Sequence, residues 1–239
     1  MKLLIMFFLF MMNSFASNSI YIWSKEFNKE SNENIISFLK QKNINIAIIS
    51  VSHNTDFNKL NEFLSATKNK IKVEFLIGDN KWIYPEKRDK IDAKLQLLSK
   101  FNNFYIHLDV EPHALLDLKK DREKYLNMYI QMLQYIKKNY PKYNISISIP
   151  TFYNIDKVTQ MAKYVDKIYL MAYEYKKLSQ LQKRVQRYES LKTQIVVAYN
   201  CKDFTPQKLK NDIAFMSKLG YKNVAFHSYA TLKALDEIK

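Results

Sequence analysis

One strand-like stretch, FYIHLDVEPH at residues 104–113, indicates how the chain folds. Successive side chains of a β-strand point to opposite faces, so the apolar residues at 106, 108 and 110 share one face. His107, Asp109 and Glu111 share the other face. We therefore expect the apolar face to pack against helices and the ionisable face to point into a barrel of strands.

The rest of the chain alternates between short β-type runs and segments with helical periodicity. A Thr205-Pro206 pair is typical of a helix start, and Gly220 stands where a glycine would close that helix. The longest helical segment runs from Lys119 to about Tyr140. The eight β-type runs are Ile20–Ser24, Ile44–Val51, Ile71–Ile77, Phe104–Val110, Asn144–Pro150, Lys167–Tyr173, Gln194–Tyr199 and Asn223–Tyr229.

This alternation predicts an α/β fold, a single (β/α)8 TIM barrel over residues 17–239. An open doubly wound sheet is the alternative. That fold prefers a glycine-rich phosphate turn after its first strand, whereas Trp23 and the residues that follow it include no glycine.

Composition excludes several other classes. Two Gly, five Pro and 47% hydrophobic residues exclude a disordered or collagen-like chain, and a single cysteine excludes an internal disulfide. The formal net charge of +15 is spread over several helical segments. It indicates solvated helix faces or attraction to an acidic polymer, and no base-reading motif supports nucleic acid as a partner.

The first residues are typical of an export signal. Lys2 precedes an unbroken apolar run from Leu3 to Met12, and the small residues Ser14 and Ala16 follow at the positions typical of a cleavage site. This pattern predicts a signal peptide over residues 1–16 and a secreted or periplasmic product. The run is shorter than the ~20 residues that span a bilayer, so we expect no stable membrane insertion after cleavage.

The fourth strand also provides candidate catalytic groups. Asp109 and Glu111 are two positions apart and partly desolvated, so both should not stay ionised. We expect Asp109 to be ionised and Glu111 to be protonated near neutral pH, the state that a general acid needs. His107 is expected either to bind substrate or to belong to a buried structural cluster.

The ends of other strands add polar and aromatic groups that suit sugar rings. Met171-Ala172-Tyr173-Glu174 ends the sixth run, and Phe152 follows the fifth. The expected substrate-binding residues are His107, Glu174, Trp23, Trp82, Tyr199, His227 and Tyr229.

Asp109-Val110-Glu111 together with Met171-Ala172-Tyr173-Glu174 resembles the motifs of family 18 glycoside hydrolases, which are chitinase-like barrels. The resemblance implies that Glu111 is the catalytic acid, that Asp109 steadies the N-acetyl group of the substrate and that Tyr173 hydrogen-bonds the reacting amide. The chain departs from the family pattern at His107, where the family has an aspartate, and at Glu174, which replaces another aspartate. No tryptophan ends the eighth strand.

The sequence therefore predicts an exported glycoside hydrolase-like protein acting on a cell-envelope glycan or other polysaccharide, acidic or N-acetylated. The alternatives are a non-catalytic glycan-binding barrel and a metal-dependent hydrolase or deacetylase, for which His107, Asp109, Glu111, His113 and His227 could provide ligands. Family 25 lysozyme-like barrels also carry D-x-E on a central strand, so peptidoglycan is a further candidate. Because no H-x-H or H-E-x-x-H pattern occurs, we expect no metal. We also expect no cofactor and a monomeric protein.

Overall fold

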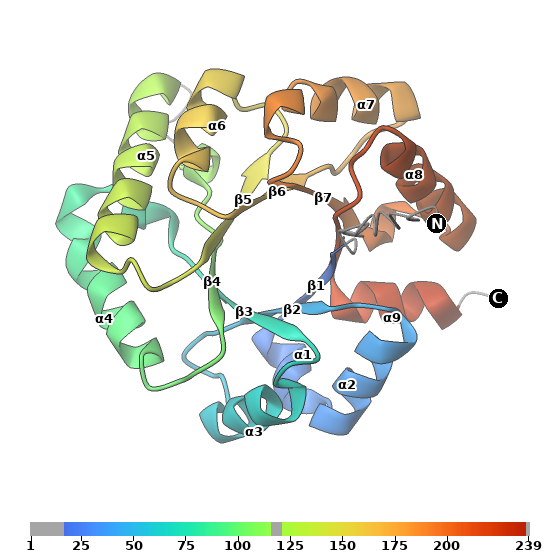
Figure 1. The fold of residues 1–239 in the computed structure, drawn as a ribbon, viewed down its shortest axis with the longest axis horizontal. Coiled ribbons are helices and arrows are strands. Elements are labelled where there is room, and N and C mark those ends of the chain that lie inside the picture. Colours follow the sequence, from blue (N-terminus) through green and yellow to red (C-terminus); the bar gives the residue numbers. More distant parts are fainter. Residues whose placement is uncertain (1–16, 116–120, 238–239) are drawn as a thin grey trace, which may run out of the picture.

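The computed structural model describes residues 17–115 and 121–237, so the predicted signal peptide lies outside the described residues. Its strands form a closed parallel barrel in the order β1 to β8, which confirms the predicted single (β/α)8 TIM barrel (Figure 1). β1 closes the ring by pairing with β8, with Ser19 opposite Ala225. The strands are β1 Asn18–Ile22, β2 Ile46–Ser50, β3 Lys72–Ile77, β4 Tyr105–Leu108, β5 Ile145–Pro150, β6 Lys167–Met171, β7 Ile195–Asn200 and β8 Val224–His227.

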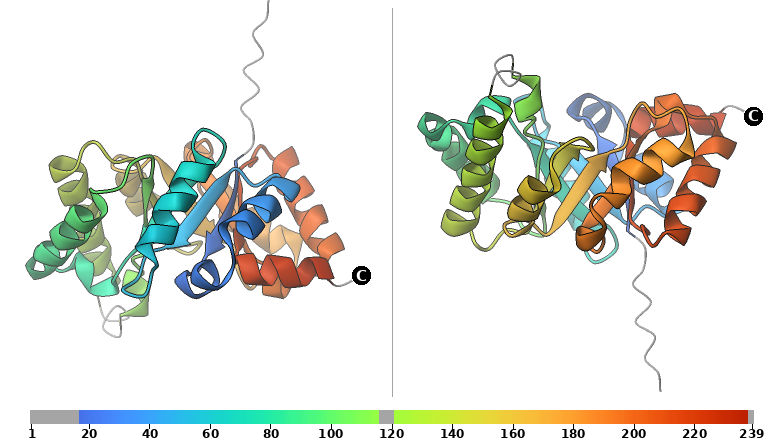
Figure 2. Two further views of the ribbon diagram at one scale, coloured as in Figure 1. Left: turned by 90° about the horizontal axis from the view of Figure 1, so that it is seen from below. Right: turned by 90° about the horizontal axis from the view of Figure 1, so that it is seen from above.

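Helices surround the ring and cover its outer face (Figures 1 and 2). In the described part of the chain none of them is both long and apolar enough to span a membrane. The α-helices are α1 Ser24–Lys29, α2 Asn32–Gln41, α3 Phe57–Thr67, α4 Arg88–Leu98, α5 Arg122–Asn139, α6 Ile155–Ala162, α7 Leu178–Gln186, α8 Pro206–Lys218 and α9 Tyr229–Glu237. Short 3-10 helices include η1 Asn80–Ile83, η2 Pro85–Lys87, η3 Pro112–Ala114, η5 Glu189–Leu191 and η6 Cys201–Asp203.

Each predicted β-type run overlaps one strand of the barrel, with shifted ends. β1 begins and ends two residues earlier than predicted, so Trp23 follows the strand. The long helix is α5, which begins at Arg122, where the Asp121 side chain accepts a hydrogen bond from the Lys124 amide and caps it. The predicted start at Lys119 lies outside the described residues. The Thr205 side chain caps α8 as predicted, and Gly220 follows that helix with φ +89°.

The barrel has two separate cores. Between ring and helices lie alternate strand residues such as Ile106, Leu108 and Val110, as the alternation in the fourth strand predicts. Inside the ring, a smaller cluster around Tyr21 and Tyr169 fills the barrel together with polar side chains. The predominantly apolar outer layer packs the helices against the ring, and the buried polar groups of the interior are hydrogen-bonded to one another.

The carboxyl ends of β3 and β4 lie unusually close together. A Cβ atom added at Gly78 would lie 2.1 Å from the carbonyl oxygen of Asp109, a separation that no side chain permits. The Asp109 amide also donates to the Ile77 carbonyl at 3.0 Å. The absence of a side chain at Gly78 therefore lets the strand that carries Asp109 sit against its neighbour.

Candidate active site

Glu111 lies just beyond the end of β4, where it immediately precedes the short helix η3. Its main-chain N–H donates to Oδ1 of Asn80 at 2.7 Å, which ties it to η1 after the preceding strand. Its side chain is about one third exposed, at 32%. The carboxyl group is therefore held at a rim, partly out of water but open to a ligand.

A cavity of about 460 Å³ opens beside this carboxyl group. The residues that line it come from the ends of β4, β5 and β6 and from α7, so the cavity lies at the C-terminal mouth of the barrel, where TIM-barrel enzymes bind their substrates. Glu111 and Tyr173 open onto this one cleft. Its lining residues are Glu111, His113, Pro150, Thr151, Phe152, Met171, Tyr173, Glu174, Arg184 and Arg187.

The surroundings of Glu111 keep its carboxyl group protonated to a higher pH than that of an ordinary glutamate. Burial raises its pKa first, and the negative charge of Asp109 raises it further. The sequence points to the charge of Asp109, whereas in the structure burial is the larger cause. His113 Nε2 lies 3.9 Å from Glu111 Oε2, but burial and the charge of Arg122 lower the pKa of His113, which weakens its ability to hold Glu111 ionised.

An aromatic cluster sits next to the cleft, over the end of the barrel. The His227 ring contacts the rings of Tyr21, Trp23 and Tyr173, each with centroids 5.6 Å apart. Burial, Asp109 and Glu111 raise the pKa of Tyr173, so its hydroxyl keeps its proton and can donate a hydrogen bond. Burial lowers the pKa of His227, and its Nδ1 is buried with no hydrogen-bond partner among the described residues.

His107 lies below this cluster, fully buried inside the barrel. Its Nδ1 is 2.8 Å from Ser146 Oγ, and its Nε2 is 2.8 Å from Ser148 Oγ. Since Ser146 Oγ donates to Glu74 Oε2 at 2.6 Å, it must accept from His107, which places a proton on Nδ1. His107 is therefore part of a buried structural cluster and is closed off from substrate.

Glu74 is the charged member of this cluster that sequence reasoning missed. It is buried in β3, and burial alone would raise its pKa. The hydrogen bond and charge of His107, together with Lys72 and Ser146, outweigh burial and lower the pKa of Glu74 to about 2. Glu74 and Phe75 are consecutive in the third run and therefore point to opposite faces of the strand. The alternation that places His107 inside the barrel in the fourth strand also predicts that Glu74 is inside.

Besides the buried His107, three more of the expected substrate-binding residues lie away from the cleft. Tyr199 is fully buried and faces the helices, because the alternation that turns Ala198 into the barrel turns Tyr199 outward. Trp82 is buried at a separate cavity of about 700 Å³ next to β3. Tyr229 is buried against Phe38, and its hydroxyl reaches Glu30 at 3.4 Å.

The cleft contains other groups that the sequence did not single out as a set. Arg184 and Arg187 come from α7 and the residue that ends it, and Arg184 Nη1 donates to the Tyr173 carbonyl at 2.9 Å. Phe152 is 47% exposed, and the guanidinium of Arg122 lies 4.7 Å from its ring centroid. Glu174 lines the cleft with an exposed side chain and φ +54°. No group of three or more potential metal ligands occurs in residues 17–115 and 121–237.

The fold is shared with several glycoside hydrolases of known structure. The chain aligns over 90% of its length with 90% of a chitinase from Bacteroides thetaiotaomicron (11% identity, TM-score 0.70). It aligns over 90% of its length with 95% of the glycoside hydrolase domain of PelA from Pseudomonas aeruginosa (10% identity, TM-score 0.57). The resemblance in fold to chitinase-like barrels is thus confirmed.

The same fold also serves other chemistry. A tryptophan synthase chain from M. tuberculosis matches with 10% identity and a TM-score of 0.55, over 93% of this chain and 86% of that one. Neither a protein-family model nor a curated protein sequence matches the chain. Structural likeness at this identity establishes the barrel, and the function must be argued from the site.

Proposed function

We propose that this protein is an exported glycoside hydrolase in which Glu111 is the general acid. The observation that carries the proposal is that Glu111, with its raised pKa, shares one cleft with Tyr173 at the C-terminal mouth of the barrel. A carboxyl group that stays protonated near neutral pH can give its proton to the oxygen of a glycosidic bond as that bond breaks.

Asp109 and Tyr173 have complementary roles in this scheme. Asp109 lies two residues before Glu111 and does not itself line the cleft, and its charge raises the pKa of both Glu111 and Tyr173. An ionised Asp109 stabilises the positive charge that develops on the sugar or on a neighbouring N-acetyl amide. The Tyr173 hydroxyl donates to that amide and orients it.

The lining of the cleft supports an acidic or N-acetylated glycan as substrate. Arg187 adds an exposed guanidinium, which suits a carboxylate or sulfate group on the sugar. The exposed ring of Phe152 provides a flat surface for the C–H face of a sugar ring. A glycan on the cell envelope or outside it is consistent with the export signal in the sequence and with a secreted or periplasmic monomer.

The experiment compares the wild-type protein with Glu111→Gln on uronate-containing, N-acetylated and neutral polysaccharides. Removing the acid should lower turnover by about 10²-fold or more with the thermal unfolding profile retained. Glu86→Gln, an exposed carboxylate outside the cleft, is the matched control and should leave turnover unchanged. Turnover that survives Glu111→Gln would reject this assignment.

A non-catalytic glycan-binding barrel is the second candidate. The observation that favours it is His107. This imidazole lies inside the barrel at the position where family 18 glycoside hydrolases, which the sequence resembles, have an aspartate. Tight glycan binding by the wild type without release of any product from the same polysaccharide panel would select this function instead.

A further inference from the structure

A third cavity, of about 640 Å³, opens at the opposite end of the barrel from Glu111. It lies where the loops enter β2, β3, β4 and β5, at the N-terminal ends of these strands. Four lysines line it, namely Lys68, Lys70, Lys72 and Lys142, and no Asp or Glu does. Its volume lies within the range of about 300–1,000 Å³ that is typical of ligand sites.

Three of these four positive charges are not neutralised. Lys72 is the exception, because its Nζ lies 3.5 Å from Glu74 Oε1. Lys68, Lys70 and Lys142 are exposed and form no ion pair with any described residue. Lys142 lies over the ring of Tyr143 at 5.0 Å, a contact that leaves its charge available. A recess with three unpaired cations and no anionic residue in its lining attracts a negatively charged ligand.

Amide side chains provide the remaining polar surface of the recess. Asn69 and Asn103, whose φ angles are +64° and +62°, belong to its lining, and so does Asn144. An amide both donates and accepts, so it suits a hydroxyl group as well as an anion. A concave site of this kind fits a polymer with hydroxyl and acidic groups better than a flat lipid surface, which reaches only protruding side chains.

We propose that this recess, defined by Lys68, Lys70, Lys72 and Lys142, binds a segment of an acidic polysaccharide. The site is separate from the catalytic cleft, and the proposal does not rest on hydrolysis at Glu111. It gives the protein two glycan contacts at opposite ends of one barrel, so that a long chain or a polysaccharide layer can be held while the cleft stays open.

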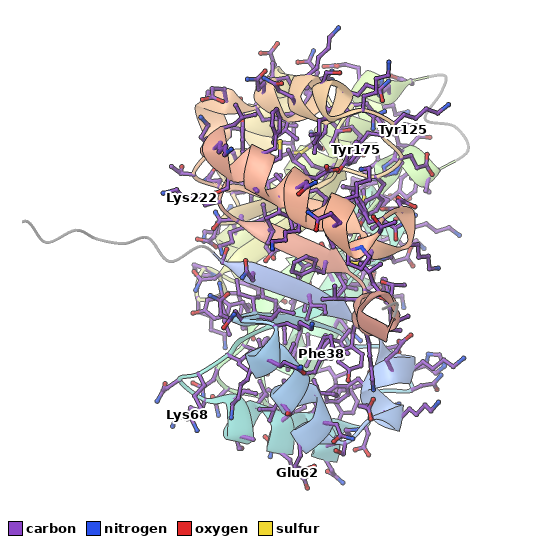
Figure 3. The ribbon with its side chains drawn as sticks, turned by 90° about the vertical axis from the view of Figure 1, so that its right-hand side faces the viewer. Phe38, Glu62, Lys68, Tyr125, Tyr175 and Lys222 are labelled. Atoms are coloured by element: carbon purple, nitrogen blue, oxygen red, sulfur yellow. The ribbon has the colours of Figure 1, made fainter. Side chains whose placement is uncertain are left out.

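The test measures the affinity of the protein for polygalacturonate by calorimetry, with dextran as the uncharged comparison. One variant combines Lys68→Gln, Lys70→Gln and Lys142→Gln. A matched variant makes the same change of charge at Lys176, Lys210 and Lys222, which are exposed and do not line the recess. Lys222 projects from the same side of the molecule as Lys68, so it also controls for the charge of that face (Figure 3).

The recess variant should bind polygalacturonate at least about tenfold more weakly, while the matched variant stays within about twofold of the wild type. Equal losses in the two variants, or no loss in either, would overturn the proposal, because the net charge alone would then explain the binding. Binding to vesicles of anionic phospholipid that depends more strongly on the recess lysines than polygalacturonate binding does would also overturn it.

Two further measurements separate this site from the cleft. The comparison is repeated in an Arg187→Gln background, in which the cleft has lost its exposed cation. The recess substitutions should still weaken polygalacturonate binding in that background. Thermal unfolding of the recess variant should match that of the wild type, because all three substituted lysines are exposed. If no polysaccharide is hydrolysed, the proposed function fails. The binding comparison then still tests whether the recess binds an acidic polysaccharide.

Discussion

The main-chain N–H of Glu111 donates a 2.7 Å hydrogen bond to Oδ1 of Asn80, so the segment after β3 positions the candidate acid at the end of β4. Asn80 is itself held at the start of η1, next to Asp79, whose side chain accepts from the Lys81 amide. The segments that follow two neighbouring strands of the barrel thus together place one carboxyl group.

Asn80→Ala should lower kcat by about 10–100-fold with little change in KM, because Glu111 loses its anchor while the cleft keeps its shape. Asn80→Asp keeps an acceptor oxygen and adds a negative charge near Glu111. It should restore much of the rate and move the basic limb of the pH profile of kcat/KM to higher pH. A purely structural role for Asn80 would leave that pH profile where it is.

Gly78→Ala tests the close approach of β3 and β4. The new methyl group would collide with the Asp109 carbonyl oxygen, so the end of one strand must move. We expect a loss of about 1–3 kcal/mol in the free energy of unfolding, measured by urea denaturation, together with reduced turnover. Unchanged stability and turnover would show that these strand ends are free to separate.

Glu111→Gln should change how stability depends on pH. The raised pKa means that the folded protein binds this proton more tightly than the unfolded chain does, so the wild type loses stability as pH rises from the ordinary glutamate range through the folded pKa. The variant has no such proton. Its free energy of unfolding relative to the wild type should therefore be higher at pH 7 than at pH 4, as measured by urea denaturation.

The same pair of measurements on Glu86→Gln, at an exposed position, should show little difference between the two pH values. If the free energy of unfolding of Glu111→Gln relative to the wild type decreases from pH 4 to pH 7, that result would contradict the raised pKa of Glu111.

Glu74→Gln should destabilise the protein by about 3–5 kcal/mol at pH 7, because it breaks a buried charged cluster and leaves Lys72 and His107 without their anion. The lowered pKa of Glu74, about 2, gives stability that is present above the ordinary pKa and is lost as pH falls towards 2. The difference in free energy of unfolding between the variant and the wild type should therefore become smaller as pH falls towards 2. Glu62→Gln on α3, which is exposed, should change stability by less than about 0.5 kcal/mol.

Phe152→Ala should weaken glycan binding by roughly fivefold to tenfold, because an exposed aromatic surface at the cleft is lost. Stability should change little, since the ring is 47% exposed. Leu97→Ala on α4 removes another exposed apolar side chain, 41% exposed and away from the cleft, and should leave the affinity unchanged. Equal affinity of Phe152→Ala and the wild type would exclude sugar stacking at this position.

The sequence by itself determined the barrel and the inward row of its fourth strand. Both depend on local patterns: alternation at every second residue fixes which side chains share a strand face, and alternating strands and helices predict a parallel sheet. The missing glycine turn after the first strand favours a closed barrel over an open doubly wound sheet. That is why His107 is inside and Ile106 outside, as predicted. The same rule, applied to the third and seventh strands, accounts for the inward Glu74 and the outward Tyr199.

Only the tertiary structure decided which of these groups meet. Glu74 contacts His107 across a strand pair, and Arg187 reaches the cleft of Glu111 from a helix more than seventy residues along the chain. Trp82 follows a strand end, as Phe152 does, yet one is buried beside another cavity and the other stands at the cleft. Segments beyond the strand ends have no fixed period, so their side chains are directed by packing against parts of the chain that are remote in sequence.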